Sequence, residues 1–316
     1  MKKISLLCVI TAILVSISSS ANNSKKNELV ALNLPTVKNF INEFKNENIY
    51  TEKELENIFS KTIIKKKKIV SAQKNQAEKK LTWKGYKNLV VTNTRIQGGK
   101  LFILTNKNIL EKAESIYSVD KEIITAILGV ETNYGFKKGD YRAIDALSTL
   151  SFEYYPRGTF FKGELKEFLK YTKNNKLDPF SIKSSWAGAI GYPQFIPSSI
   201  NNYAIDFDND GKIDLVNSVA DAVGSIGNYL NKNGFKKESY YYDKLNIKET
   251  TVSNGLKLDK NCSTIKVADK YCKDKFKIFK LDDDYYIGGR TFYAITKYNR
   301  SNLYASAVLE IAKSLK

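Results

Sequence analysis

The chain has 316 residues, of which 42% are hydrophobic and 27% are charged, and its formal net charge is +18. This length and composition suit a globular protein with one large domain or two smaller ones, and they argue against disorder. The chain contains no histidine, which excludes a Ser-His or Cys-His nucleophile pair, a zinc site with histidine ligands and imidazole acid-base catalysis. Carboxylates and tyrosines remain as candidates for proton transfer.

Residues 1–21 have the pattern of a signal peptide. Two lysines precede an apolar run over residues 4–17, and the small residues 19–21 suit a signal peptidase. The run is shorter than the ~20 apolar residues that span a bilayer, so cleavage is favoured over a membrane anchor. Cys8 lies inside the run after bulky Leu7, which does not fit a lipid-attachment site. We therefore predict a soluble periplasmic protein, with no transmembrane segment in the mature chain and lipid anchoring disfavoured.

The mature chain remains strongly basic, because cleavage removes two lysines and lowers the net charge from +18 to +16. Lysines at 65–68, 79–80 and 236–237 spread this charge thinly, without the interleaved aromatic residues of single-strand nucleic-acid binders. We expect no nucleic-acid partner. An anionic envelope polymer or membrane surface fits an exported basic protein better, and a codon bias toward lysine explains the charge without any partner.

Helical patterns dominate the chain. Thr51 and Glu54 have the spacing of a capping box, which begins a helix reaching about Phe59 in the N-terminal helical segment, residues 22–80. Later apolar periodicities predict helices over about 106–117, from 120 through the Glu131 segment, around 161–169, over about 219–230 with Gly234 as its end, and from Ser301 onward. These patterns place a helical core at residues 81–235 and a segment that completes it at 293–316.

The helix that begins near Asp120 carries the most informative acid in the chain. Glu131 lies on the same stripe as Ile127 and Leu128, on the face that the helix turns toward the core. A carboxyl group among apolar side chains has a raised pKa and keeps its proton to higher pH, as a general acid requires. Glu131 is therefore the candidate general acid.

Two further segments carry chemistry or ligands. Between 184 and 199, Ser185 and Gln194 are polar groups among small and apolar residues, which fits the wall of a ligand groove; tight helix packing with incidental polar residues is the alternative. Residues 206–221 match most of an EF-hand calcium loop, with a glycine at the sixth position. The predicted ligands are Asp206, Asp208, Asp210 and the Lys212 carbonyl, with Asp221 replacing the absent glutamate of position 12. Bound Ca²⁺ would be structural, and a solvated turn is the alternative.

Residues 236–292 change to short alternating or aromatic stretches bounded by Asn-Gly and Gly-Gly pairs, which predicts a small β-containing subdomain. Cys262 and Cys272 are the cysteines that remain after cleavage, and both lie in this insert. In an oxidising compartment they are expected to form a disulfide, with two free thiols as the alternative.

Five blocks of the chain, taken together and in order, resemble the lytic murein transglycosylase B family. They are 127–135 (ILGVETNYG), 146–152 (ALSTLSF), 155–157 (YPR), 187–199 (AGAIGYPQFIPSS) and 295–299 (ITKYN), and the calcium loop follows the fourth. The resemblance covers roughly residues 83–315. It implies a mainly α (α+β) fold: a lysozyme-like helical catalytic core with an EF-hand-like calcium loop and a small β subdomain.

The resemblance also implies an activity, cleavage of the β-1,4 bond between N-acetylmuramic acid and N-acetylglucosamine in peptidoglycan. No water is consumed, since the muramyl C6 hydroxyl attacks C1 and leaves a 1,6-anhydro end. Glu131 matches the glutamate that first donates and then accepts a proton. Residues that match substrate contacts of the family are Tyr86, Arg157, Ser185, Gln194, Tyr229, Tyr298, Asn299 and Tyr304. For Tyr229 and Tyr304 a plain core role stays open, because both fit helical apolar stripes.

The sequence departs from the family in three places. Gly158 stands where the family has a second arginine after Arg157, the signal lacks a lipid-attachment motif, and the cysteine pair has no family counterpart. The expected partners are peptidoglycan glycan strands and, further, other cell-wall enzymes. Two other functions stay open, a muramidase-type hydrolase that shares Glu131 and a non-catalytic calcium-stabilised protein that binds peptidoglycan.

Overall fold

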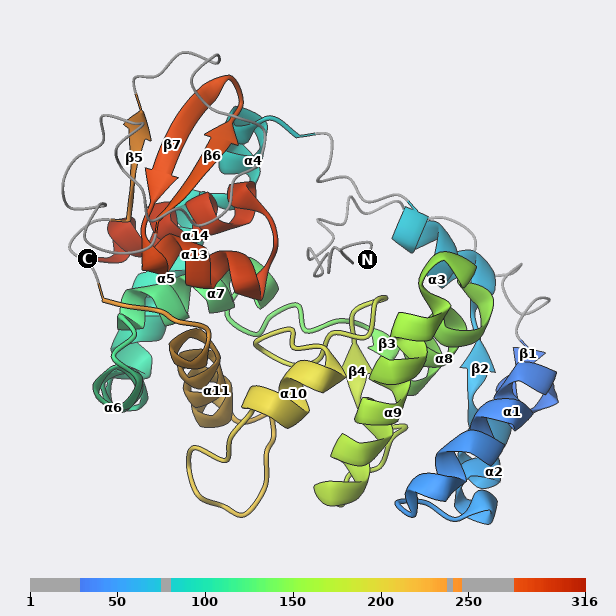
Figure 1. Ribbon diagram of the computed structural model, residues 1–316. Helices are drawn as coiled ribbons and strands as arrows, with labels where there is room; N and C mark the ends of the chain where they lie inside the picture. Colours follow the sequence, from blue (N-terminus) through green and yellow to red (C-terminus); the bar gives the residue numbers. More distant parts are fainter. Residues whose placement is uncertain (1–28, 75–80, 238–240, 246–275) are drawn as a thin grey trace. The chain divides into compact units, whose positions relative to one another are not determined.

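The computed structural model describes residues 29–74, 81–237, 241–245 and 276–316 (Figure 1). These residues form two compact units, each built from separate stretches of the chain. One unit combines residues 81–134 with the described part of 223–316, and the other combines 29–74 with 135–222. This division cuts across the linear core of 81–235 expected from the sequence. The signal segment 1–21 and the pair Cys262 and Cys272 lie outside the described residues.

The unit of 29–74 and 135–222 is mainly helical. Its elements are β1 (Leu29–Val30), η2 (Ala31–Asn33), α1 (Pro35–Phe44), η3 (Lys45–Glu47), α2 (Glu52–Lys61), β2 (Ile63–Ile64), α3 (Lys66–Lys74), β3 (Tyr141–Arg142), α8 (Ala143–Glu153), η5 (Tyr155–Arg157), α9 (Gly158–Asn174), β4 (Lys183–Ser184) and α10 (Pro197–Tyr203). Strand β1 pairs with β2 and β3 pairs with β4, both antiparallel. The capping box is confirmed: Thr51 accepts from the Glu54 amide, and the Glu54 side chain accepts from the Thr51 amide.

Aromatic side chains join the N-terminal helices of this unit to α8. Phe40 of α1 makes edge-on contacts with Phe59 of α2 and Phe152 of α8, at centroid distances of 5.7 Å in both cases. Tyr50 adds a polar tie, because its hydroxyl donates to the Leu169 carbonyl of α9 at 3.0 Å. Residues 29–64 therefore pack against α8 and α9, the two helices that precede the candidate groove segment of residues 184–199.

The other unit is built around α7. Its elements are α4 (Trp83–Val90), α5 (Asn93–Thr105), α6 (Lys107–Tyr117), α7 (Lys121–Thr132), most of α11 (Val219–Lys232), β5 (Tyr242–Leu245), β6 (Lys277–Leu281), β7 (Asp284–Gly288), α13 (Arg290–Tyr298) and α14 (Asn302–Leu315). Helices α5, α6 and α14 all contact α7. Every residue of α7 from Ile123 to Thr132 is buried, so this helix is enclosed on all sides.

The three described strands of this unit form one antiparallel sheet in the order β5-β7-β6, within the stretch 236–292 expected to be β-containing. The Phe279 ring of β6 stacks on the Phe292 ring of α13, with centroids 3.9 Å apart and planes 13° apart. Phe276, Ile278 and Ile287 form a separate small apolar cluster. The sheet thus packs directly on the helix that leads to the fifth block of the sequence.

The apolar periodicities in the sequence predicted some of the helices, whereas others, among them the amphipathic α1, α4 and α13, were not predicted. The expected helices over about 106–117, 120–131, 161–169 and 219–230 and the one capped by Ser301 are confirmed as α6, α7, α9, α11 and α14. Helix α5 was not expected, because Leu101, Phe102, Ile103 and Leu104 are consecutive and follow no helical stripe. Leu104 is 74% exposed there, so tertiary contacts rather than amphipathic pattern define this helix. In the described part of the chain, none of the helices has the length and hydropathy needed to cross a bilayer.

Lys277 on β6 links the sheet to α14, because its Nζ donates to Asn302 Oδ1 at 2.9 Å. Burial, together with the nearby charge of Lys297, lowers the pKa of Lys277 from 10.5 to about 8. Between pH 8 and 10.5 the unfolded chain holds this proton and the folded chain releases it, so the contribution to the free energy of unfolding rises with pH in this window.

We predict that Lys277→Met is more stable relative to the wild type at pH 7.5 than at pH 9.5, because methionine buries no charge. The difference in unfolding free energy should change by at most about 1.4 kcal/mol per pH unit. Denaturant unfolding of both proteins at several pH values measures it. A difference that stays constant over this range would show that the Lys277 amine is not perturbed.

Candidate active site

Glu131 lies in the last turn of α7 and is 3% exposed. Its neighbours on the predicted stripe, Ile127 and Leu128, are fully buried, so the orientation inferred from the sequence is confirmed. The ionised carboxylate is disfavoured here for two reasons, burial among apolar groups and proximity to the negative end of the helix dipole. The protonated form of Glu131 is favoured by both.

Tyr304 opposes these two effects. Its hydroxyl donates to Glu131 Oε1 at 2.7 Å, across 173 residues of sequence, and a hydrogen bond of this kind stabilises the carboxylate. Complete burial raises the pKa of Tyr304 well above 10.0, and the charge of Glu131 adds to this. The Tyr304 hydroxyl therefore keeps its proton at neutral pH, and it donates to one oxygen of the carboxyl group.

Aromatic rings surround this pair within the same unit. The Tyr298 ring lies nearly parallel to the Tyr304 ring, with centroids 6.5 Å apart and planes 7° apart, and Tyr229 meets Tyr298 edge-on at 5.0 Å. The Tyr229 hydroxyl donates to the Lys297 carbonyl at 2.8 Å. Tyr86 of α4 is 2% exposed and near enough to contribute to the raised pKa of Tyr304. Four of the tyrosines singled out in the sequence are thus gathered near Glu131.

Asn299, which directly follows α13, has a buried side chain with an unused donor. It is 1% exposed, and in the described part of the chain its Nδ2 has no hydrogen-bond partner. An unpaired buried amide costs about 1–3 kcal/mol, and pairing with a ligand group is one way to remove that cost. This makes Asn299 a strong candidate for a ligand contact.

The unit of 29–74 and 135–222 carries the remaining predicted substrate contacts. Gln194 adopts a left-handed backbone conformation with φ 50°, and its Nε2 donates to the carbonyls of Gly191 at 2.9 Å and Lys138 at 3.2 Å. Its Oε1 is buried and accepts no hydrogen bond from the described residues. Gly191 has φ 71°, and a Cβ there would lie 2.1 Å from the Leu215 carbonyl oxygen, so only glycine fits this turn. The amide of Gln194 is held rigidly and keeps one acceptor unused.

Ser185 and Arg157 have more ordinary surroundings. The Ser185 hydroxyl accepts from the Ala189 amide at 3.1 Å, which closes the turn before Gln194. The Arg157 guanidinium lies over the rings of Phe160 and Phe161, at 4.5 and 5.1 Å from their centroids. Gly158, at the position of the family's second arginine, begins α9.

The candidate calcium loop brings three carboxylates together. Oxygens of Asp206, Asp208 and Asp210 lie within 4.8 Å of one another, as the sequence spacing predicts for cation ligands. Asp206 also accepts the amide hydrogens of Asp210 and Gly211, at 3.1 and 2.8 Å, which gives the loop its tight turn. Among the described residues, no lysine or arginine forms an ion pair with any of the three aspartates.

Asp221, the fourth aspartate predicted as a ligand, lies outside this group of three. Its two oxygens accept the backbone amides of Phe207 and Asp214, both at 2.8 Å, and the side chain is 1% exposed. Burial raises the pKa of Asp221, and the two amide hydrogen bonds oppose that rise. From the first turn of α11, Asp221 therefore holds Phe207 and Asp214 of the loop in place through their backbone amides.

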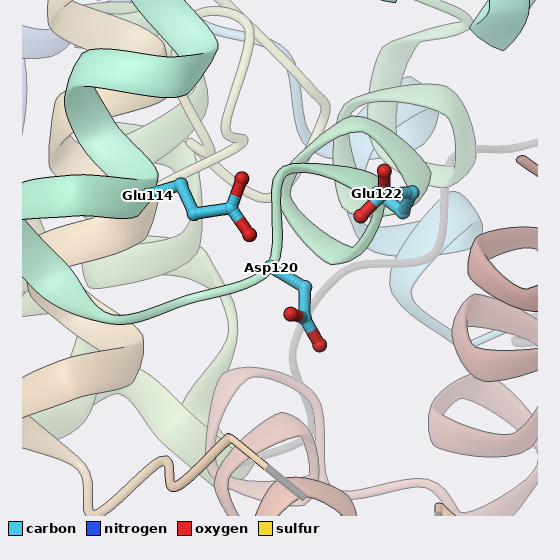
Figure 2. A group of neighbouring side chains, drawn as sticks. All are labelled: Glu114, Asp120 and Glu122. Atoms are coloured by element: carbon cyan, nitrogen blue, oxygen red, sulfur yellow. The ribbon is translucent and has the colours of Figure 1, made fainter. Parts of the chain in front are cut away.

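A second acidic group contrasts with this loop. Figure 2 shows Glu114 from α6, Asp120 immediately before α7 and Glu122 in the first turn of α7, whose oxygens also lie within 4.8 Å of one another. Here lysines neutralise the charge: Lys237 Nζ lies 2.9 Å from both Glu114 and Asp120, and Lys121 bridges Glu114 and Glu122 at 3.5 and 3.7 Å. This group is an ion-pair cluster that anchors residues after α11 to α6 and α7.

Comparisons with known proteins agree with this geometry. Residues 33–313 match the family model described as the transglycosylase SLT domain. The chain belongs to this family. It is 32% identical over 301 residues to the membrane-bound lytic murein transglycosylase B of Escherichia coli strain K12, an alignment that covers 90% of this chain and 83% of the relative.

Solved structures of the family extend the comparison. The structure of the Escherichia coli lytic transglycosylase SLT35 in complex with calcium matches with a TM-score of 0.79 and 32% identity, over 90% of this chain and 93% of that one. The structure of SltB3 from Pseudomonas aeruginosa in complex with NAG-anhNAM-pentapeptide matches with a TM-score of 0.76 and 25% identity, over 88% and 79%. The fold class expected from the sequence, mainly helical and lysozyme-like, is therefore confirmed.

We predict that Tyr304→Phe lowers kcat about ten- to hundred-fold with little change in KM, because a hydrogen bond to a charged group contributes about 1.5–3 kcal/mol. The variant keeps the ring and its packing, so circular dichroism should be unchanged. Initial rates on purified peptidoglycan measure the effect, and an unchanged kcat would contradict the role given to the hydroxyl.

Proposed function

We propose that this lytic transglycosylase cleaves the β-1,4 bond between N-acetylmuramic acid and N-acetylglucosamine in peptidoglycan and leaves 1,6-anhydromuramic acid ends. The family relationship supports the enzyme class, and a relative of known structure binds an anhydromuramic fragment. The observation that carries the proposal for this chain is the buried Glu131 carboxyl, 3% exposed and held by Tyr304 at 2.7 Å.

In this mechanism, Glu131 acts twice. As a carboxylic acid it protonates the glycosidic oxygen, which breaks the bond to C1 of the muramyl residue. As a carboxylate it then takes the proton of the C6 hydroxyl, whose oxygen bonds to C1. The burial of Glu131 favours the acid form that the first step needs, and the Tyr304 hydroxyl stabilises the carboxylate between the two steps.

The surroundings of Glu131 support a mechanism with one carboxylate. Asp120 is the other fully buried carboxylate among the described residues of this unit, and Lys237 engages it at 2.9 Å. It lies at the N-cap of α7, eleven residues before Glu131, which is about 16 Å along the helix axis at ~1.5 Å per residue. Glycosidases that use two carboxylates separate them by about 5–9.5 Å, so Asp120 cannot be the partner of Glu131.

Substrate contacts are proposed for the residues with unused or aromatic surfaces. The buried Nδ2 of Asn299 and Oε1 of Gln194 would pair with sugar hydroxyl or acetamido groups, which removes the cost of leaving them unpaired. In the unit that carries Glu131, Tyr86, Tyr229 and Tyr298 would line the glycan site. In the unit of 29–74 and 135–222, Ser185 and Arg157 are proposed glycan contacts. Glycan strands are the partner, and association with other cell-wall enzymes remains a prediction.

A structural calcium ion fits the loop of 206–221. Three carboxylates within 4.8 Å, with no lysine or arginine paired to them in the described residues, leave a negative charge that a divalent cation would neutralise. Asp206, Asp208 and Asp210 would hold the ion, with the Lys212 carbonyl as the expected fourth donor. A relative of known structure binds calcium, and we propose the same for this chain. The ion would fix the loop, and Glu131 needs no metal for its chemistry.

Location in the periplasm is also proposed, on the signal pattern of residues 1–21 and on a cell-wall substrate. The similar Escherichia coli protein is named membrane-bound.

We predict that Glu131→Gln loses at least about three orders of magnitude of activity while its melting temperature changes little. Glutamine keeps an acceptor oxygen for Tyr304, but it can neither donate nor accept the catalytic proton. Mass spectrometry of digested sacculi is the measurement. Wild-type products should carry anhydro ends, lighter by one water than hydrolysed ends.

Three other outcomes of that experiment are informative. Reducing ends from the wild type would indicate a muramidase-type hydrolase. Binding of glycan without turnover by either protein would indicate a scaffold protein. Normal turnover by Glu131→Gln would contradict the catalytic assignment.

For the calcium loop, we predict that Ca²⁺ raises the melting temperature, by the equivalent of about 2.7 kcal/mol when free Ca²⁺ is 100 times Kd. Asp208→Asn should reduce this rise. Glu114→Gln, which alters the lysine-neutralised cluster of Figure 2, is the matched control and should keep the full rise even if its basal stability falls. An equal calcium response in wild type and Asp208→Asn would refute the site.

A further inference from the structure

The two residues after the last turn of α7 adopt an unusual backbone. Asn133 and Tyr134 are both left-handed, with φ of 50° and 62°. Asparagine tolerates this conformation, but a bulky side chain such as tyrosine rarely adopts it. Such a conformation persists only where surrounding contacts determine it, and it is found most often beside functional groups. The turn begins two residues after Glu131.

The Tyr134 ring is held in a slot made by three glycines of two helices. A Cβ added to Gly129 of α7 would lie 2.6 Å from the Tyr134 hydroxyl oxygen and 2.7 Å from its Cζ. From α5, a Cβ on Gly98 would lie 2.9 Å from Cε2 of the same ring, and one on Gly99 would lie 2.7 Å from its hydroxyl oxygen. The ring therefore lies closer to the backbones of both helices than any residue other than glycine at these three positions would allow.

Hydrogen bonds close the slot and connect it to the end of α7. The Tyr134 hydroxyl donates to the Arg95 carbonyl at 2.6 Å, and Arg95 Nε donates to the Gly129 carbonyl at 3.0 Å. The Arg95 guanidinium also donates to the Val90 carbonyl at the end of α4. The ring itself stacks on Phe102 of α5, with centroids 5.6 Å apart. Tyr134 therefore contacts α5 directly and is connected to α4 and α7 through Arg95.

We infer that Tyr134, seated between Gly98, Gly99 and Gly129, is a positioning residue that fixes the last turn of α7 and with it the Glu131 carboxyl group. The inference rests on the proposed catalytic role of Glu131. Tyr304 orients the carboxyl end of the side chain, and Tyr134 fixes the backbone from which that side chain extends. A displacement of about 1 Å at a catalytic group can reduce the rate about a hundred-fold, so this anchor matters for the rate more than for substrate binding.

The first test changes the ring and the slot separately. Tyr134→Ala should lower kcat about ten- to hundred-fold with KM within about two-fold, whereas Tyr134→Phe, which keeps the ring, should lose only a few-fold. Gly129→Ala should lower kcat as Tyr134→Ala does, and Gly98→Ala by a smaller factor. The matched control is Gly163→Ala in α9, where an added Cβ meets nothing within 4 Å, and it should keep wild-type kcat and KM.

The second test is a double-mutant cycle, which separates positioning from a general loss of stability. In the Tyr134→Ala background the methyl group of Gly129→Ala enters space that the ring has left, so it should cost less than about two-fold in kcat. Losses that multiply in the double variant would overturn the inference. All variants are assayed at a temperature where circular dichroism shows them folded; if Tyr134→Ala does not fold, the cycle is run with Tyr134→Leu.

Refutation of the positioning role of Tyr134 can be distinguished from refutation of the proposed function. Turnover by Glu131→Gln would remove the catalytic assignment and with it the basis of the inference. If Glu131→Gln is inactive while both Gly129→Ala and Tyr134→Ala turn over like the wild type, the positioning role alone is refuted. A rise in KM at constant kcat would also refute it, since the slot would then act on binding.

Discussion

The candidate active site depends on one buried carboxyl group, that of Glu131, and on the groups around it that act on its protonated and ionised forms. Glu131 is placed where burial and the helix dipole favour its protonated form, and the hydroxyl of Tyr304 stabilises its ionised form. A group that must donate a proton and later accept one needs neither state to be strongly preferred. The hydrogen bond from Tyr304 of α14 therefore opposes the effect of burial on the candidate catalytic group.

Several contacts in the unit of 81–134 and 223–316 hold α7 and the residues around Glu131 in place. Helix α7 is enclosed by α5, α6 and α14, so its last turn cannot fray toward solvent. The small sheet stacks Phe279 on Phe292 at the start of α13, the helix that leads through Tyr298 to Asn299. Lysine-neutralised acids hold the beginning of α7, and Tyr134 holds its end. Contacts thus hold both ends of the helix that carries Glu131, the candidate catalytic acid.

The two acidic groups show how similar residues serve different purposes. Both place three carboxylates within 4.8 Å, but Lys121 and Lys237 neutralise the group at Glu114, while no described lysine or arginine pairs with Asp206, Asp208 or Asp210. Local charge balance, rather than the number of acids, separates an ion-pair cluster from a candidate cation site. In the loop of the three aspartates, Asp221 accepts the backbone amides of Phe207 and Asp214 and so holds these two parts of the loop together.

The sequence by itself determined what depends on near neighbours in the chain. The capping box at Thr51, the stripe that buries Glu131 and the spacing of the three loop aspartates follow from helix and turn geometry over a few residues, and all three were predicted. The family blocks added the enzyme class. Only the tertiary structure decided which distant groups meet: Tyr304 reaches Glu131 across 173 residues, Tyr134 enters a slot lined partly by Gly98, and Asp221 turns its oxygens to amides instead of joining the aspartates. Such contacts leave no periodic signal in the sequence, because they are set by how helices far apart in the chain pack against one another.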